Sequence, residues 1–250
     1  MTSTSAAYLE KHGNIARLIL NRPEVLNAEN WQMARDFHVA LSQVEEDGDI
    51  KAVVVTGAGR AFSSGIDLKA LAAGELKGDW FRSFDEAMRR LEQLNALTVA
   101  RIRGYALGGG LQIALACDLR VSTPEARFGL PAVLEALIPG MGTYRLPRFI
   151  GLGRARRMVL TGELIGAEEA LRIGLIDWVV PEEKLDEKVQ SVIAGVMSGS
   201  ATARGYAKKL VTGSFESTFD EAFAKYLQYQ DECLKSPDHA QAMTQFRKKK

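Results

Sequence analysis

Apolar and polar residues along the first 180 positions predict strands that alternate with helices. Short apolar, β-branched runs bounded by glycine, proline or charged residues predict strands at 15–20, 52–56, 98–103, 119–122 and 175–180. Apolar residues spaced three and four apart predict helices, and two such stripes are Trp31, Ala34, Phe37, Leu41, Val44 and Phe81, Phe84, Met88, Leu91, Leu94. A further helix is expected at 110–116. The alternation is typical of an α/β fold.

From Pro181 onward the pattern is helical only. One stripe contains Leu185, Val189, Val192 and Val196, and another contains Phe219, Phe223 and Leu227. The sequence therefore predicts an α/β core at 1–180 and a C-terminal helical region at 181–250, a segment of the kind that often packs against a neighbouring subunit.

Composition and charge exclude several classes of protein. The 250 residues contain 32 Lys and Arg against 31 Asp and Glu, so no long-range field attracts nucleic acid or an acidic membrane. No window approaches the roughly 20 apolar residues that span a bilayer. Two cysteines cannot form a disulfide framework, and the N-terminus lacks the features of a secretory signal. We expect a cytoplasmic protein.

Two glycine-containing turns suggest a site for a carbonyl oxygen. Residues 60–69 follow the strand at 52–56, and residues 104–110, which end in three glycines, lie between a strand and a helix. Glycine lets a ligand approach the backbone, and the start of a helix presents free N–H groups. Together the turns could direct two N–H groups at one oxygen. Either turn alone could equally be an ordinary connection between a strand and a helix.

Rival sites fit the sequence less well. The dinucleotide fingerprint fails because Phe62 occupies the position of its third glycine. The phosphate-binding P-loop and the G-x-S-x-G elbow of hydrolases are both missing. The three histidines, His12, His38 and His239, lie far apart, so a zinc site is not expected.

Several motifs together resemble the enoyl-CoA hydratase/isomerase (crotonase) superfamily. The motifs are Asn21-Arg22-Pro23 with Asn27-Ala28, the run Ala61-Phe62-Ser63-Ser64-Gly65-Ile66-Asp67-Leu68, the run at 104–110, Cys117-Asp118, Phe128-Gly129-Leu130-Pro131, Ile138-Pro139-Gly140 and Leu160-Thr161-Gly162-Glu163. The resemblance implies a spiral of ββα units, a C-terminal helical trimerisation region, and trimers or dimers of trimers. It also implies an acyl-CoA substrate with no cofactor beyond the coenzyme A moiety, and no nucleic-acid or membrane partner.

The resemblance further implies roles for individual residues. The oxyanion-hole N–H groups would belong to Ile66 and Gly109. The coenzyme A channel would be lined by Val25, Ser64, Ile66, Asp67, Leu68, Lys69, Gly109 and Ala132, with Phe246 and Lys249 added from the C-terminus. Lys69 could meet the CoA phosphates as a point charge.

Two positions depart from the hydratases of this family. The two glutamates that hold and activate water there are replaced by Gln112 and Ala132, neither of which exchanges a proton at neutral pH. If Pro131 opens a short helix, Glu135 shares a face with Ala132 and could serve as the only carboxylate, with Gln112 orienting the acyl chain or a water. This favours an isomerase, or a lyase that decarboxylates or cleaves a C–C bond. A non-catalytic acyl-CoA binder, or a hydratase with a non-standard acid or base, stays open.

Overall fold

The structure is a computed structural model that describes the backbone of residues 5–247 and the side chains of residues 5–244. The chain forms two compact units, of which the first ends at Gln190 and the second begins at Ser191. This division lies ten residues beyond the predicted end of the core at residue 180. Each unit is described by itself.

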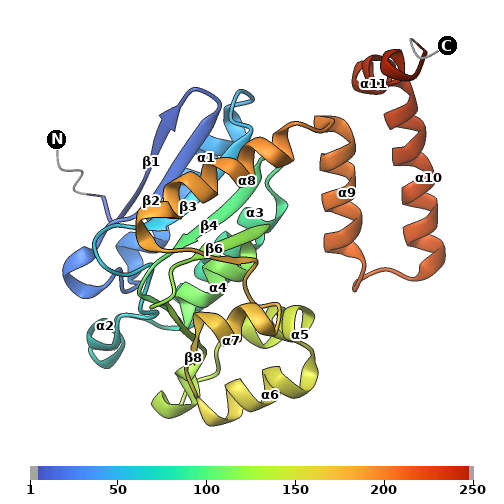
Figure 1. Cartoon of the computed structure of the whole chain (residues 1–250). Helices are drawn as coiled ribbons and strands as arrows, with labels where there is room; N and C mark the ends of the chain where they lie inside the picture. Colours follow the sequence, from blue (N-terminus) through green and yellow to red (C-terminus); the bar gives the residue numbers. More distant parts are fainter. Residues whose placement is uncertain (1–4, 248–250) are drawn as a thin grey trace. The chain divides into compact units, whose positions relative to one another are not determined.

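The first unit is built on a six-stranded sheet with the order β1-β2-β3-β4-β6-β9 (Figure 1). Its strands are β1 (Ala7–His12), β2 (Ile15–Leu20), β3 (Ala52–Gly57), β4 (Leu97–Ile102), β6 (Leu119–Ser122) and β9 (Trp178–Val179). Only the edge strand β1 runs antiparallel to its neighbour. All six residues of β3 are buried, as expected for a parallel strand covered on both faces.

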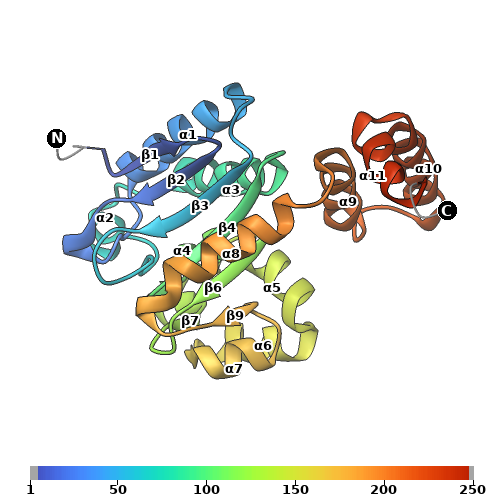
Figure 2. The ribbon, with the colours of Figure 1, turned by 45° about the horizontal axis from the view of Figure 1, so that its top comes forward.

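Helices cover both faces of this sheet (Figure 2). Helices α1 (Trp31–Glu46) and α3 (Gly78–Gln93) pack against each other on one face, and they bury Phe37, Leu41, Met88 and Leu91. On the other face lies the beginning of α8 (Leu185–Met197), where Asp186 forms ion pairs with Arg17 of β2 and Arg101 of β4. The short 3₁₀ helix η3 (Glu182–Lys184) precedes α8.

A smaller sheet places the loops that form the site. It contains β5 (Tyr105–Leu107), β7 (Arg127–Gly129) and β8 (Ile165–Gly166), with β7 in the centre. Helix α4 (Gly109–Ala116) follows β5 at once, and every residue from Gly110 to Ala116 is buried. Apart from Gln112 its side chains are apolar, as expected for a helix that lies inside the core.

Short helices complete the first unit. They are the 3₁₀ helices η1 (Pro23–Val25) and η2 (Pro131–Glu135) and the helices α2 (Leu68–Ala72), α5 (Gly142–Ile150), α6 (Leu152–Thr161) and α7 (Ala167–Arg172). Helix α6 packs against both α5 and η2.

The second unit is helical. Helix α9 (Ala201–Gly213) packs against α10 (Phe219–Lys235), and α11 (Pro237–Arg247) follows after Ser236. Tyr206 and Tyr229 stack between α9 and α10 with their ring centroids 4.3 Å apart. Thr218 and Glu221 form a capping box that begins α10. None of the helices in the described part of the chain combines the length and apolar character that crossing a bilayer requires.

Most of the predicted elements are present, and one is wrong in extent. The strands predicted at 15–20 and 119–122 match β2 and β6, and the two helical stripes match α1 and α3. The strand predicted at 175–180 is reduced to Trp178–Val179. Leu175 and Ile176 are buried without joining the sheet, so their apolar character reflects packing and not strand pairing.

Candidate active site

The two glycine-containing turns are joined by backbone hydrogen bonds. Ser63 forms an isolated parallel bridge with Ala106 of β5. The Ser63 N–H donates to the Tyr105 carbonyl oxygen over 2.9 Å, and the Leu107 N–H donates to the Ser63 carbonyl oxygen over 3.0 Å. The turns that the sequence predicts to act together therefore lie side by side.

Glycine is required where these turns touch. Gly65 and Gly108 have φ angles of 94° and 52°, in the region that other residues avoid. A Cβ on Gly110 would lie 2.6 Å from the Ser63 carbonyl oxygen. The start of α4 thus packs directly on the Ser63 turn, with no room for a side chain between them.

Asn27 fixes the turn that follows β3. Its buried side-chain amide donates to the carbonyl oxygens of Ala58, Ala61 and Phe62, and its Oδ1 accepts from the Arg22 N–H. The motif Asn21-Arg22-Pro23 with Asn27 is therefore a scaffold for the site.

The amides of Ile66 and Gly109 are both available to a ligand. Glu29 donates its N–H to the Gly65 carbonyl oxygen and accepts the Asp67 N–H, so in this parallel bridge the Ile66 N–H faces away from Glu29. Gly109 is the first residue of α4, where helical N–H groups have no acceptor within the helix. Neither amide has a hydrogen-bond acceptor among the described residues.

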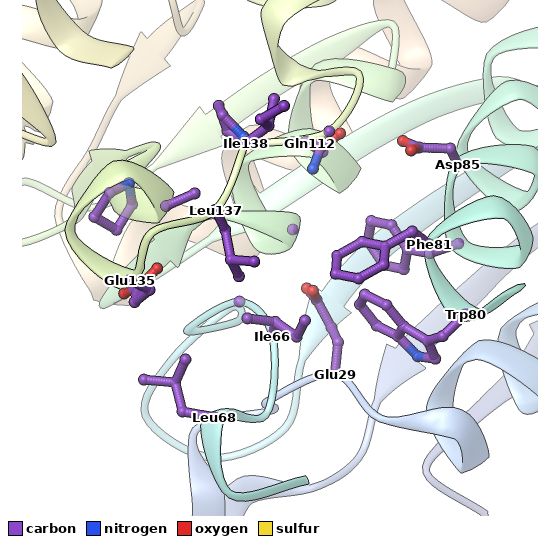
Figure 3. Close-up of a pocket in the computed structure, with 18 of the residues that line it drawn as sticks. Glu29, Ile66, Leu68, Trp80, Phe81, Asp85, Gln112, Glu135, Leu137 and Ile138 are labelled. Carbon is purple, nitrogen blue, oxygen red and sulfur yellow. The ribbon is translucent and has the colours of Figure 1, made fainter. Parts of the chain in front are cut away.

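Both amides belong to one pocket (Figure 3). Trp80, Phe81 and Phe84 of α3 give it an aromatic wall, and Trp80 stacks on Phe84 with centroids 5.3 Å apart. Leu137 and Ile138 close the opposite side. No cationic side chain lines the pocket among residues 5–244. An apolar cavity with two free N–H groups suits an acyl group whose carbonyl oxygen lies between them.

Glu29 is a buried carboxyl group in this pocket that the sequence analysis missed. The residue is 1% exposed, Oε1 accepts a hydrogen bond from Ser63 over 2.8 Å, and Oε2 has no partner among the described residues. Burial raises the pKa of Glu29 to about 8, although the Ser63 hydrogen bond opposes this. No local pattern marks Glu29, which follows Ala28 and precedes Asn30, the N-cap of α1.

Gln112 and Asp85 are two further polar residues that line the pocket, and they lie near each other (Figure 3). Both side chains approach Gly140, where an added Cβ would lie 3.3 Å from Asp85 Oδ2 and 3.3 Å from Gln112 Nε2. Burial raises the pKa of Asp85, against the Arg145 charge and the Met141 amide. The sequence predictions do not include Asp85, although its position four residues after Phe81 puts both on one face of α3.

Ala132 and Glu135 both line the pocket, from the 3₁₀ helix that begins at Pro131 as predicted. The Glu135 side chain is exposed, and burial by its surroundings still raises its pKa. In Figure 3 it lies on the side of the pocket away from Asp85. Its role as the base stays a prediction.

The residues expected to bind coenzyme A fall into three groups. Ser64 and Leu68 line the pocket with Ile66, Gly109 and Ala132. Val25, Asp67 and Lys69 lie in the neighbouring turns but not in the lining of this pocket. The Phe246 side chain and all of Lys249 lie outside the described residues.

Asp67 has a structural role in this region. Its carboxylate caps α2 by accepting from Lys69 and Ala70, and it forms a 2.9 Å ion pair with Arg22. Burial raises the pKa of Asp67, but Arg22 and the two amides outweigh it and leave the pKa lowered. The negative charge of Asp67 is therefore stabilised by Arg22 and by the two backbone N–H groups.

Known proteins match almost the whole chain. The profile of the family Enoyl-CoA hydratase/isomerase matches residues 10–250. The chain belongs to this family. It is 35% identical to a short-chain-enoyl-CoA hydratase of Clostridium acetobutylicum, across 97% of this chain and 94% of the relative. It is 31% identical to a crotonyl-CoA hydratase of Syntrophomonas wolfei, across 97% and 95%.

Solved structures of the enoyl-CoA hydratase/isomerase family agree with this assignment. The crystal structure of an enoyl-CoA hydratase from Bacillus anthracis superimposes with a TM-score of 0.91 at 30% identity, and covers 98% of this chain and 97% of its own. The chain therefore has the mixed α/β crotonase fold with a helical C-terminal region, and is an acyl-CoA enzyme of this superfamily.

Proposed function

We propose that this enzyme stabilises the enolate of an acyl-CoA thioester and that its reaction is an isomerisation or a lyase reaction. One observation carries the proposal: the Ile66 and Gly109 N–H groups have no acceptor among the described residues and belong to the same pocket. Two preorganised donors aimed at one oxygen are what the developing negative charge of an enolate requires.

The proposed proton transfer follows from the residues at positions 112 and 132, which are not acids. By the resemblance, Gln112 and Ala132 would stand where hydratases of this family have glutamates, and neither side chain can exchange a proton to add water by the paired-glutamate mechanism. Glu135 would remove a proton from the carbon next to the carbonyl, and the C–H electrons would move to the thioester oxygen. Returning that proton two carbons further along completes an isomerisation. In a lyase reaction, the enolate is instead formed by breaking a bond to carbon, and Gln112 orients the acyl chain or a water.

The coenzyme A moiety would leave the pocket past Ser64, Leu68 and Ala132. Lys69, at the exposed start of α2, would meet its phosphates, and Val25 and Asp67 would shape the channel from the adjoining turns. Phe246 and Lys249 would add an aromatic and a basic contact. We further propose that the enzyme acts in the cytoplasm.

A binding experiment with acetoacetyl-CoA tests the oxyanion site directly. This thioester has an acidic C2 hydrogen, and its enolate absorbs in the ultraviolet where the keto form does not. We expect stoichiometric binding at pH 7 with growth of the enolate band. Absence of that band would overturn the proposal. Binding of saturated acyl-CoA esters without turnover across enoyl, malonyl and 3-oxoacyl thioesters would favour a non-catalytic binder.

A hydratase that uses a non-standard acid is the second candidate. The relatives are named hydratases. In addition, the side chains of Asp85 and Gln112 both approach Gly140, and a carboxylate and an amide placed in this way could hold a water. Hydration of crotonyl-CoA at a rate comparable with isomerisation of 3-enoyl-CoA would favour this candidate. Isomerisation alone would favour the first.

A further inference from the structure

Glu29 touches both halves of the oxyanion site. Its backbone holds the Ile66 segment through the Gly65 and Asp67 hydrogen bonds, and its carboxyl group lies against Gly109. A Cβ built on Gly109 would lie only 1.7 Å from Glu29 Oε2. Glu29 Oε2 therefore lies beside the Cα atom of Gly109, in the space that a side chain at that position would fill.

The hydrogen bonds of Ser63 distinguish the two carboxyl oxygens of Glu29. Ser63 Oγ accepts the Gly65 N–H over 3.1 Å and donates its own hydroxyl hydrogen to Glu29 Oε1 over 2.8 Å. Oε1 is therefore an acceptor. When Glu29 is neutral its proton is on Oε2, the oxygen that has no partner among the described residues.

The surroundings favour the neutral acid. The other acids that line the pocket are Asp85 of α3 and Glu135 of η2, while Asp67 lies beside it, paired with Arg22. Arg145 is 3.9 Å from Asp85 and does not line the pocket. Burial without a cationic partner raises the pKa of Glu29 to about 8, so the group carries its proton at neutral pH.

We propose that Glu29 is a third donor at the oxyanion site, a neutral carboxylic acid whose Oε2–H donates a hydrogen bond to the thioester enolate oxygen beside the Ile66 and Gly109 amides. A buried O–H without an acceptor is costly, and an acyl carbonyl oxygen supplies one. This inference rests on the proposed function, because it needs an enolate at that place. It makes Glu29 a catalytic residue distinct from Glu135, which would move the proton at carbon.

The sign of the pH dependence follows from this assignment. Below the raised pKa of about 8 the acid is neutral and donates; above it, the ionised group repels the enolate. Binding of the enolate then requires one proton on Glu29. The association constant of the wild type, relative to a variant that cannot ionise there, falls about tenfold per pH unit above about pH 8.

The experiment compares the wild type with Glu29→Gln and Glu29→Leu. Acetoacetyl-CoA is titrated into each from pH 6 to pH 10, and the enolate band gives the association constant. Gln keeps a donor, so at pH 7 we expect a loss of no more than about tenfold, with no decline above pH 8. Leu removes the donor, and we expect a loss of about a hundredfold or more, the scale of one oxyanion donor. Glu86→Gln, which changes an exposed glutamate of α3, is the matched control and should follow the wild type.

Thermal unfolding of the same proteins gives a readout that needs no ligand. The pKa of Glu29 is raised from 4.5 to about 8 by folding, so the folded state holds the proton more tightly. Wild-type stability is therefore highest below about pH 4.5 with respect to this group, and it declines as pH rises to about 8. Relative to the wild type, Glu29→Gln should become progressively more stable over that range, whereas Glu86→Gln should not.

The outcomes separate the two proposals. If the wild type forms the enolate but its association constant relative to Glu29→Gln does not change with pH, the role of Glu29 is wrong and the proposed function stands. A stability difference that is independent of pH also overturns the neutral acid. If the wild type forms no enolate, the proposed function fails, and the role of Glu29 toward it fails with it.

Discussion

At the scale of single residues, Glu135 is the position where the proposed chemistry is most open to test. Glu135 is the last residue of η2 and lines the pocket. The pKa of its carboxyl group is raised because its surroundings partly exclude water. Glu135→Gln keeps the shape and hydrogen-bonding capacity but cannot accept a proton. Exchange of the C2 hydrogens of butyryl-CoA for deuterium, followed by NMR, should slow at least about a hundredfold, with binding of the CoA ester nearly unchanged.

The control for this prediction is another glutamate in a 3₁₀ helix. Glu183 of η3 is exposed and does not line the pocket, so Glu183→Gln should exchange at the wild-type rate. Unchanged exchange in Glu135→Gln would remove Glu135 from the mechanism and direct attention to Asp85.

The residues of the site differ in how far the sequence predicts them. Ile66 and Gly109 are assigned through short contiguous motifs that resemble the family, and the glycines in these motifs are visible in the sequence alone. Glu29 cannot be assigned in this way, because its burial depends on Ser63 and Gly109, which are distant in sequence. A glutamate after Ala28 has no local feature that distinguishes an active-site acid from a solvated one, and charged residues are mostly exposed.

At the scale of elements, the start of α4 determines the spacing of the two oxyanion amides. Gly110 is the second residue of that helix, and a Cβ there would lie 2.6 Å from the Ser63 carbonyl oxygen. Because that atom belongs to the backbone, Gly110→Ala must move α4 away from the Ser63 turn. We expect a loss of about 1–3 kcal/mol in the free energy of unfolding and a fall in enolate formation of at least about a hundredfold.

Gly153 provides the matched control. It is also the second residue of a helix, α6, and a Cβ there would meet nothing within 4 Å. Gly153→Ala should therefore leave enolate formation unchanged and raise stability by up to about 1 kcal/mol in chemical denaturation. Equal behaviour of the two variants would show that Gly110 is not needed for close packing.

Elements with a clear period are the ones the sequence predicts. Helices α1 and α3 have one apolar face, and β2 and β6 are bounded by turn or charged residues, so local pattern is sufficient. Strand β1 is not predicted, because Glu10, Lys11 and His12 form half of an edge strand that is specified mainly by pairing with β2. The two- and three-residue strands β5, β7 and β8 are too short to show a period, and β9 lies within the longer run predicted at 175–180.

At the scale of the whole molecule, the helical second unit has large apolar side chains that are exposed. Helices α9 and α10 contain no buried side chain. Phe219, Phe223 and Tyr226 stack in sequence along α10, and Phe219 is 79% exposed. Helices in water depend mainly on tertiary packing of an apolar face, and contiguous exposed apolar patches mark interaction sites.

This surface supports the expectation of a homotrimer or a dimer of trimers. Sedimentation equilibrium of the wild type should therefore give three or six times the mass of one chain. The double variant Phe219→Ser, Phe223→Ser should dissociate at a concentration at least about a hundredfold higher, because each lost aromatic contact removes about 1.5–3 kcal/mol of apolar burial. Val39→Ser, which changes an exposed apolar residue of α1, should sediment as the wild type does. A wild type that sediments as a monomer would contradict the assembly and leave the apolar face of α10 to be covered in another way.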